Sequence, residues 1–180
     1  CGNMTHRSTC GCKPMGASSG FNLYSPTFVR GMEEYEILDI VRDFGKAVNL
    51  AREAGFDCVE IHAGHGYLIS QFLSPYTNHR HDIWGGNLEN RMRFMKFVIR
   101  EVMDAALDDI AVVVKINMFD GVKSGIQVDE AILIAKELEK LGVHALVLSA
   151  GFVSKAPMEV MRGAMPIKTM AYYMNMWKFW

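Results

Sequence analysis

The chain has 180 residues, half of them apolar and 22% charged, and its formal net charge is −1. This composition is typical of a soluble globular domain, and it lacks the concentrated positive charge that binding to nucleic acid or to an anionic membrane surface requires. No apolar run approaches the roughly 20 residues that span a bilayer, and the first residues do not form a secretory signal. Because the chain begins with Cys1 and not with methionine, we expect its natural N-terminus to lie upstream.

Residues 1–32 are rich in Gly, Ser, Thr and Pro and lack sustained periodicity, which predicts a loop. Three of the four cysteines of the chain lie in this segment, namely Cys1, Cys10 and Cys12. The Cys-x-Cys spacing is tighter than that of zinc knuckles, and no second Cys or His pair follows at finger distance, so we expect no metal. Reduced thiols in a cytoplasmic protein are the favoured interpretation, and a zinc-binding N-terminal module is the alternative.

From residue 34 onward, stretches with helical apolar spacing alternate with short strand-like runs. The predicted helices cover residues 34–54, 68–73, 88–106 and 129–141, and the predicted strands cover residues 57–62, 110–116 and 145–149. Gly55 and Gly142 stand where two of these helices end, and Asn87 can cap the helix that begins at residue 88. Alternating strands and helices joined by short turns predict parallel βαβ units.

Parallel βαβ units form either an open doubly wound sheet or a closed barrel. His62, Lys115 and Ser149 lie at or near the C-terminal ends of the three predicted strands, where (β/α)₈ barrels place their catalytic groups. No Gly-x-Gly-x-x-Gly follows the first strand, so a dinucleotide-binding open sheet lacks its main motif. The barrel is therefore favoured, although a complete one has eight strands and about 250 residues. We predict an α/β fold that is a partial TIM (β/α)₈ barrel, with residues 1–180 forming a fragment of a single flavin-binding domain.

A long motif begins at the end of the first predicted helix. It runs Ala54-Gly-Phe-Asp-Cys-Val-Glu-Ile-His-Ala-Gly-His-Gly-Tyr-Leu68 and continues through Gln71-Phe-Leu-Ser-Pro75, Thr77-Asn78, Arg80, Asp82, Gly85-Gly86 and Leu88-Glu-Asn-Arg91. With this motif the chain resembles the old yellow enzyme family, which includes bacterial NADH:flavin oxidoreductases. The resemblance implies that the three strands are the fourth to sixth of the barrel, with the first three strands before Cys1 and the last two after Trp180. The pair Ala63-Gly64 departs from the more usual Gly-Ala, a change that we expect the fold to tolerate.

The resemblance also implies a cofactor and roles for particular residues. The cofactor would be FMN, with NADH or NADPH as reductant, and the 4Fe-4S cluster of longer family members would lie outside this segment. His62 and His65 match the pair that anchors the substrate, and Tyr67 matches the proton donor. The residues alone also allow this, because two histidines three positions apart at a strand end can converge on one oxygen as the chain turns. Arg91 is expected to brace the loop before its helix and not to contact substrate.

Further contacts with the cofactor are expected along the same end of the strands. Strand alternation places Glu60 and His62 on one face of their strand, and if this face and that of Lys115 both point into the barrel, Lys115 lies near its active end. The family places a basic residue here against the flavin pyrimidine, and a lysine that snorkels at a strand end is the alternative. Glu60 would then be a buried partner for a basic group. The predicted cofactor-binding residues are Lys115, Ser149 and Gly151.

We therefore predict an FMN-dependent oxidoreductase that uses NAD(P)H to reduce an activated alkene of the enone, enoate or dienoyl type. A flavin-dependent amine dehydrogenase on the same scaffold and an inactive, truncated barrel fragment are the alternatives. The expected partner is a small-molecule substrate, and neither nucleic acid nor a membrane is expected. The sequence leaves the physiological substrate, the choice between NADH and NADPH, and homo-oligomerisation open.

Overall fold

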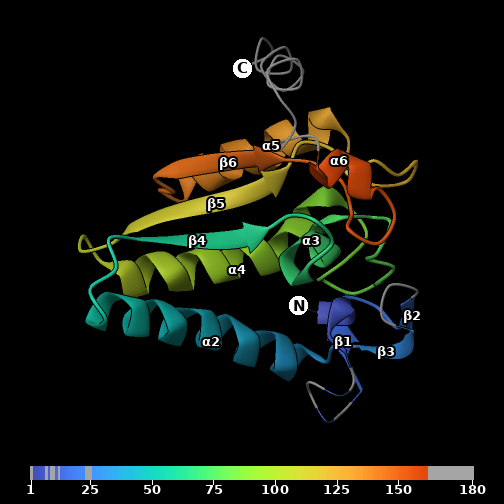
Figure 1. Ribbon diagram of the computed structural model, residues 1–180, viewed down its shortest axis with the longest axis horizontal. Helices are drawn as coiled ribbons and strands as arrows, with labels where there is room; N and C mark the ends of the chain where they lie inside the picture. The colour runs from blue at the N-terminus through green and yellow to red at the C-terminus, as the bar shows by residue number, and fades with distance from the viewer. Residues whose placement is uncertain (1, 7, 9–10, 12, 23–25, 162–180) are drawn as a thin grey trace.

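The computed structural model describes residues 2–6, 8, 11, 13–22 and 26–161, and it is built around a parallel three-stranded sheet in the order β4-β5-β6. The strands are β4 (Cys58–Ala63), β5 (Ala111–Asn117) and β6 (Ala145–Ser149), and the main helices are α2 (Glu34–Glu53), α3 (Leu68–Leu73), α4 (Leu88–Ala106) and α5 (Val128–Lys140). Figure 1 shows the strands running in the same direction, with α4 and then α2 stacked beneath β4. The predicted α/β fold of parallel βαβ units is confirmed.

The sheet has two open edges. Within the described residues, β4 pairs only with β5, and β6 also pairs only with β5. A closed barrel would give every strand two neighbours. The described sheet is therefore open and does not form a closed barrel.

The core lies between the sheet and the helices that cover one of its faces. On β5, Val112, Val114 and Ile116 are at most 1% exposed, whereas Val113 and Lys115 on the alternate positions remain partly accessible. This period of two places every second side chain against the helices. The other face, which carries Lys115, is the one that would line the interior of a barrel.

The helix ends follow the capping residues that the sequence offers. The side chain of Asn87 accepts a hydrogen bond from the backbone N–H of Asn90 at 2.9 Å and caps α4. Gly55, which follows the C-cap residue Ala54 of α2, has φ +80°. In this left-handed region a residue without Cβ carries no steric penalty. At the start of α2, Glu33 and Glu36 form a capping box.

The N-terminal segment differs from its prediction as a loop. It contains a short 3₁₀ turn, η1 (Gly2–Met4), and three strands, β1 (Met15–Gly16), β2 (Gly20–Asn22) and β3 (Thr27–Gly31). β3 pairs with β2 in antiparallel and with β1 in parallel orientation. These strands are too short to show a periodic pattern, and their partners decide their conformation, so the sequence carried no signal for them. A short helix, α6 (Pro157–Met161), was likewise not predicted.

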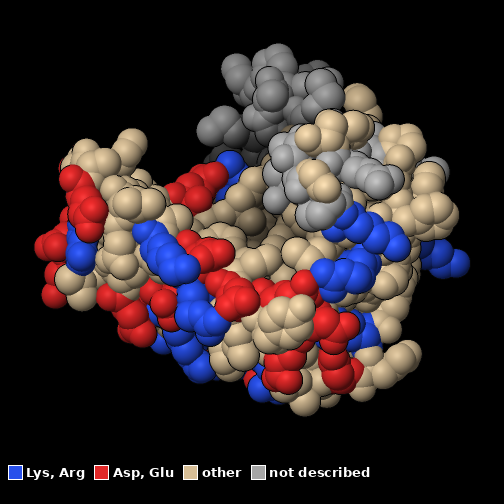
Figure 2. All heavy atoms as spheres, turned by 90° about the horizontal axis from the view of Figure 1, so that it is seen from below, with Lys and Arg blue, Asp and Glu red and all other residues tan. Residues whose placement is uncertain are grey.

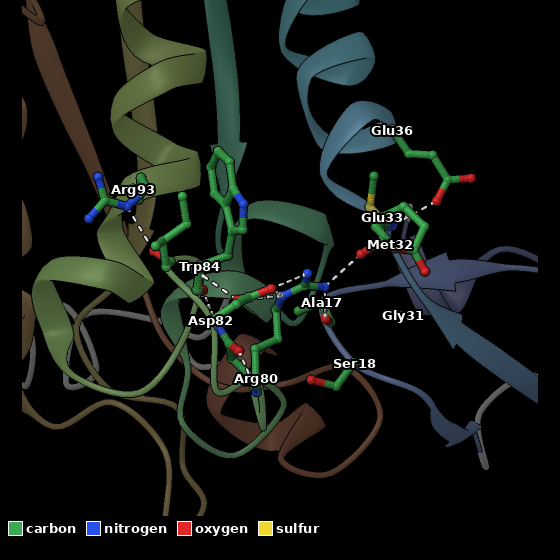
Figure 3. Close-up of polar contacts among 12 residues, drawn as sticks. Ala17, Ser18, Gly31, Met32, Glu33, Glu36, Arg80, Asp82, Trp84 and Arg93 are labelled. Carbon is green, nitrogen blue, oxygen red and sulfur yellow. Dashed lines mark hydrogen bonds and ion pairs between the residues drawn. The ribbon is translucent and has the colours of Figure 1, made fainter.

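Arg80 ties this N-terminal sheet to the loop between α3 and α4. Its Nη1 donates to the backbone oxygens of Ala17 at 3.1 Å and Met32 at 2.7 Å, and its guanidinium pairs with Asp82 at 2.6 Å. Figure 3 shows the guanidinium lying between these three residues. Asp82 also accepts from the backbone N–H of Trp84, a fully buried side chain, so the clamp continues into the core.

The surface carries both signs of charge. Figure 2 shows acidic and basic side chains interspersed over the face that includes α2, in keeping with the net charge of −1. No helix in the described part of the chain combines the length and hydrophobicity needed to cross a membrane. Among the residues that the structure describes, no group of His, Cys, Asp or Glu is arranged to hold a metal ion. Cys1, Cys10 and Cys12, on which the zinc alternative rests, lie outside the described residues.

Candidate active site

The candidate site lies at the C-terminal ends of the three parallel strands. In the register of the sheet, His62 of β4 is paired with Lys115 of β5, and Asn117 of β5 is paired with Ser149 of β6. Neighbouring residues in a parallel register project to the same face. The prediction that His62, Lys115 and Ser149 gather at one end of the sheet is therefore confirmed.

Three aromatic side chains converge just beyond β4. The rings of His62 and His65 lie 4.8 Å apart between centroids, at an interplanar angle of 86°. The ring of Tyr67 lies 4.9 Å from that of His62, at an angle of 66°. Edge-to-face contacts of this kind hold the three rings in one cluster, with His62 in the middle. The cluster combines two imidazoles and one phenol within reach of a single small molecule.

The turn after β4 is what brings His65 back toward His62. His65 has φ +61°, an unusual conformation for a residue with a side chain, and Gly66 has φ +82°. A Cβ atom at Gly66 would lie 2.2 Å from the ring of Phe152, so only glycine fits there. The backbone oxygen of His65 accepts from the N–H of Val153 at 3.2 Å, which fastens the turn to the loop after β6.

Both histidines are held as neutral rings. Burial, with the nearby charge of Lys115, lowers the pKa of His62, and burial together with His62 and Lys115 lowers the pKa of His65 to about 4. The Nδ1 atom of His62 accepts from the backbone N–H of Gly64 at 3.3 Å, which places its ring proton on Nε2. His62 can therefore donate a hydrogen bond from Nε2 without carrying a net charge. The Nε2 atom of His65 lies 2.6 Å from Ser149 Oγ, a contact that orients the ring with either tautomer.

Asn117 joins the three loops that follow the strands, a role that reasoning from the sequence missed. Its Oδ1 accepts from the backbone N–H of His65 at 3.1 Å, and its Nδ2 donates to Asp120 Oδ1 and to the backbone oxygen of Gly151, both at 3.0 Å. The side chain is 5% exposed. A Cβ at position 64 would lie 2.8 Å from Asn117 Oδ1, so Gly64 makes room for the amide. The signal in the sequence was an amide side chain at the C-terminal end of a mainly apolar strand.

Asp120, which accepts a hydrogen bond from Asn117, is itself held in place by the loop that follows β5. It is fully buried, and its Oδ2 accepts from the backbone N–H of Ile126 at 2.7 Å. Burial raises the pKa of Asp120, and its hydrogen bonds with Asn117 and Ser74 act in the opposite direction. A buried carboxyl with these partners fixes the loop between β5 and α5.

Lys115 projects from the same face as the histidines. Its Nζ lies 2.5 Å from Glu60 Oε1, so the partner predicted for a basic group is present. Glu60 is exposed and not buried, however, because no strand covers the open edge of β4 where it lies. Both backbone polar groups of Gly151 are bonded within the protein, its N–H to Phe119 and its oxygen to Asn117. The flavin contacts of Lys115, Ser149 and Gly151 remain predictions.

Arg91 braces the loop before α4, as predicted. Its guanidinium side chain is 5% exposed and donates to the backbone oxygens of Gly86 at 3.1 Å and Leu73 at 2.5 Å. It also forms an ion pair with Glu130 of α5. These contacts hold α3 and α4 together behind the site and leave Arg91 away from the histidine cluster.

A cavity of about 600 Å³ opens beside the histidine cluster and is lined by His62, His65 and Tyr67. The other lining side chains are Phe44, Glu60, Ile61, Leu68, Ile69, Val153 and Val160, which makes the wall mainly apolar. A mainly apolar cavity with a few convergent polar groups is typical of sites for cofactors and small molecules. Lys115 does not line this cavity, but the sheet register places it beside His62, which does, so the residues offer a cation next to a mainly apolar cavity, a combination that fits a flavin.

The comparison with protein families matches residues 3–179 to the NADH:flavin oxidoreductase / NADH oxidase family. Among curated proteins, the 4,4'-dithiodibutanoate disulfide reductase of Rhodococcus erythropolis is 39% identical over 140 residues, which cover 77% of the chain and 35% of the relative. The NADH oxidase of Thermoanaerobacter brockii is 38% identical over 149 residues, which cover 83% of the chain and 23% of the relative. The chain thus spans about a third or less of the length of these relatives.

Solved structures show the same partial correspondence. A 2-naphthoyl-CoA reductase complex superimposes with a TM-score of 0.78 and 29% identity over 84% of the chain and 25% of that protein. The old yellow enzyme homologue from Zymomonas mobilis gives a TM-score of 0.74 and 31% identity over 84% of the chain and 46% of that protein. Histamine dehydrogenase from Rhizobium sp. 4-9 gives 0.71 and 26% identity over 77% of the chain and 21% of that protein. The predicted resemblance and the partial barrel are both confirmed.

Proposed function

Because the chain belongs to the NADH:flavin oxidoreductase / NADH oxidase family, we propose that it forms the central part of an FMN-dependent oxidoreductase that takes reducing equivalents from NADH or NADPH. The family supports FMN as cofactor and a nicotinamide as reductant. We further propose that the substrate is an activated alkene of the enone, enoate or dienoyl type. The remaining barrel strands would be supplied by sequence before Cys1 and after Trp180, in one cytoplasmic domain.

The observation that carries this proposal is the convergence of His62, His65 and Tyr67 beside one cavity. Reduction of an alkene next to a carbonyl builds negative charge on the carbonyl oxygen. Preorganised hydrogen-bond donors stabilise such a charge most effectively in a partly buried site. The Nε2–H of His62 is one such donor. His65 would offer the second from Nδ1–H, in the tautomer in which its Nε2 accepts from the hydroxyl of Ser149.

Tyr67 would deliver the proton that completes the reduction. A phenol hydroxyl can donate a proton as a general acid. The ring of Tyr67 lies 4.9 Å from that of His62, and this contact supports a role for Tyr67 beside the imidazole that would hold the substrate oxygen. FMN, when bound, would supply the hydride that no side chain can donate.

The cofactor would lie along the same face of the sheet. Lys115 would hold the electron-rich edge of the flavin, which requires its ammonium to turn from Glu60 or to serve both partners. Ser149 would contribute through its hydroxyl, which already orients His65. A 4Fe-4S cluster, as in longer members of the family, would lie outside residues 1–180.

A flavin-dependent amine dehydrogenase is the second candidate. The likeness to histamine dehydrogenase, at 26% identity and a TM-score of 0.71, supports it as a use of the same scaffold. The two candidates differ in the direction of hydride transfer. Reduction of an enone with consumption of NADPH favours the first, and oxidation of an amine with bleaching of the flavin favours the second.

The first test is the visible spectrum of the full-length protein, followed by its two half-reactions. We expect oxidised flavin bands that bleach on addition of NADH or NADPH. The Tyr67→Phe variant should keep this bleaching rate, whereas its reoxidation by an enone should slow by about 10²- to 10⁴-fold, the usual contribution of a general acid. Tyr35→Phe, at an exposed position on α2, is the matched control. A colourless folded protein would exclude the flavoenzyme, and unchanged reoxidation would exclude Tyr67 as proton donor.

A further inference from the structure

A second cavity, of about 420 Å³, lies at the same end of the molecule as the candidate active site. Its walls come from the N-terminal strands, from the loop after α3 and from the loops after β5 and β6. The side chains that matter for its chemistry are Phe21, Tyr76, His79, Ser124, Ser154 and Lys155. Its volume is within the range of cavities that bind small organic ligands.

The charges of this cavity favour an anion. Lys155 is in its lining, and none of its described lining residues is an aspartate or a glutamate. The active-site cavity, by contrast, includes Glu60. In a chain with 20 acidic residues and a net charge of −1, a lining with a lysine and no carboxylate is a local excess of positive charge. Such a site attracts negatively charged groups.

The hydrogen-bonding groups of the cavity divide into two sets. Ser18 accepts from the backbone N–H of His79 at 2.9 Å, and Thr77 donates to the backbone oxygen of Gln71 at 2.9 Å, so both hydroxyls serve the walls. Within residues 2–6, 8, 11, 13–22 and 26–161, five polar side chains of the lining make no hydrogen bond to the walls, namely those of Tyr76, His79, Ser124, Ser154 and Lys155. Hydroxyls and an ammonium together are the groups with which proteins bind phosphate oxygens.

The cavity also offers aromatic surface. The ring of Phe21 is paired edge to face with that of Phe28 at 5.2 Å, and Phe21 is 52% exposed. On the other side, Tyr76 contacts Phe152 at 5.8 Å between ring centroids. An exposed aromatic ring beside phosphate-binding groups is suited to a planar base, which stacks on it.

The loop after β6 forms the boundary between the two cavities. Val153 lines the active-site cavity, whereas the next residues, Ser154 and Lys155, line the second one. Phe152 bridges to His65 through a β-bridge and to Tyr76 through ring contact. One extended molecule could therefore place its reactive end beside the histidines and its charged end beyond this loop.

We propose that the second cavity binds the adenosine-diphosphate end of a ligand whose reactive end occupies the candidate active site. Nicotinamide dinucleotides and coenzyme A thioesters both carry this group. Lys155 and the hydroxyls of Ser124 and Ser154 contact the phosphates, and the base stacks on Phe21. The link between the two cavities rests on the proposed function, but binding of the nucleotide itself does not.

The walls of the cavity are held in place without a ligand. The Arg80 clamp joins Ala17 and Met32 to the loop that carries His79, as Figure 3 shows around the labelled Ser18. Ser19 accepts from the backbone N–H of Gly31 at 2.9 Å and fixes the turn before β2. A preformed site loses little conformational freedom on binding, which favours affinity.

The test is titration of ADP into the full-length protein by isothermal calorimetry, which needs no catalytic turnover. We expect ADP to bind, and Lys155→Gln to weaken binding by about tenfold, equivalent to about 1.4 kcal/mol. Lys140→Gln removes the same charge from an exposed position on α5 and should bind ADP as the unaltered protein does. Circular dichroism spectra confirm that each variant is folded. Absence of ADP binding, or equal binding by Lys155→Gln, would overturn the proposal.

Steady-state kinetics then identify the source of the nucleotide. If the reductant occupies the cavity, Lys155→Gln raises KM for NADPH and leaves KM for an enoyl-CoA unchanged. If a thioester substrate occupies it, the reverse pattern appears. A variant that changes neither KM overturns the link between the cavities. Binding of ADP that depends on Lys155 in a protein without flavin would retain the site while refuting the proposed function.

Discussion

Replacement of Asn117 by alanine tests the most connected side chain of the site. The amide makes three hydrogen bonds, to the backbone of His65, to Asp120 and to the backbone of Gly151. Each such bond contributes about 0.5–1.5 kcal/mol net, and a buried partner left without a bond costs about 1–3 kcal/mol. Some of these partners will regain water in a partly open site. We therefore expect the free energy of unfolding to fall by about 2–4 kcal/mol.

The assay is urea denaturation of the full-length protein, followed by circular dichroism. Asn49→Ala, on the partly exposed surface of α2 with one contact to Arg52 at 3.3 Å, is the control and should change stability by less than about 0.5 kcal/mol. If Asn117→Ala lowers the free energy of unfolding by less than about 1 kcal/mol, the reasoning is refuted, because the three hydrogen bonds would then contribute little to stability.

Asn117→Asp separates the acceptor role from the donor role. The aspartate keeps an acceptor for the N–H of His65 but faces Asp120, whose pKa is already raised by burial. Two carboxyls in contact favour a shared proton, so the pair has a folded-state pKa above its unfolded value. Its contribution to stability is therefore present at low pH and is lost as pH rises through the folded pKa. We expect the deficit of this variant to be larger at pH 8 than at pH 5, and a deficit independent of pH would contradict this account.

Three further outcomes are expected. In an NMR titration, the His65 ring should stay neutral until pH approaches about 4. Because this pKa is below the unfolded value of about 6.5, the stabilising contribution of His65 should be complete above pH 6.5 and decline toward pH 4. A titration midpoint near 6.5 would be inconsistent with a buried ring. Arg91→Leu should lower the free energy of unfolding by about 3 kcal/mol, because it leaves Glu130 and two backbone oxygens without their donor. A thermal melt unchanged from that of the unaltered protein would argue against this role. Residues 1–180 alone should bind a hydrophobic dye and fail to retain FMN stoichiometrically, because the edges of β4 and β6 are uncovered. A monodisperse monomer with a sharp melt would disprove this expectation.

Several features of the fold were predictable because they depend on neighbours in the sequence. The apolar run of β5, the cap at Asn87 and the left-handed Gly55 each have a local physical cause, and each was predicted correctly. The gathering of His62 and Lys115 at one end of the sheet followed from strand direction and alternation. The family motif between residues 54 and 91 supplied the proposed roles of the histidines and of Tyr67.

Other features depend on residues that are distant in the sequence. The bonds of Asn117 to His65 and Gly151 span 52 and 34 positions, and the contact of His65 with Ser149 spans 84. No local pattern encodes such pairs, because hydrogen bonds form only after the strands have been set in register. The short N-terminal strands were missed for the same reason, since only their partners decide their conformation.

By itself, the sequence determined the order and type of the main elements, the end of the sheet that carries the polar residues, and the family. Those properties follow from local propensity, period and motif, which are fixed before the chain folds. The tertiary structure alone decided how His65 turns back toward His62, that Asn117 joins three loops, and that the loop after β6 contributes to two cavities, through Val153 to one and through Lys155 to the other. These depend on loops that follow separate strands, and such loops meet only when parallel pairing aligns the C-terminal ends of the strands.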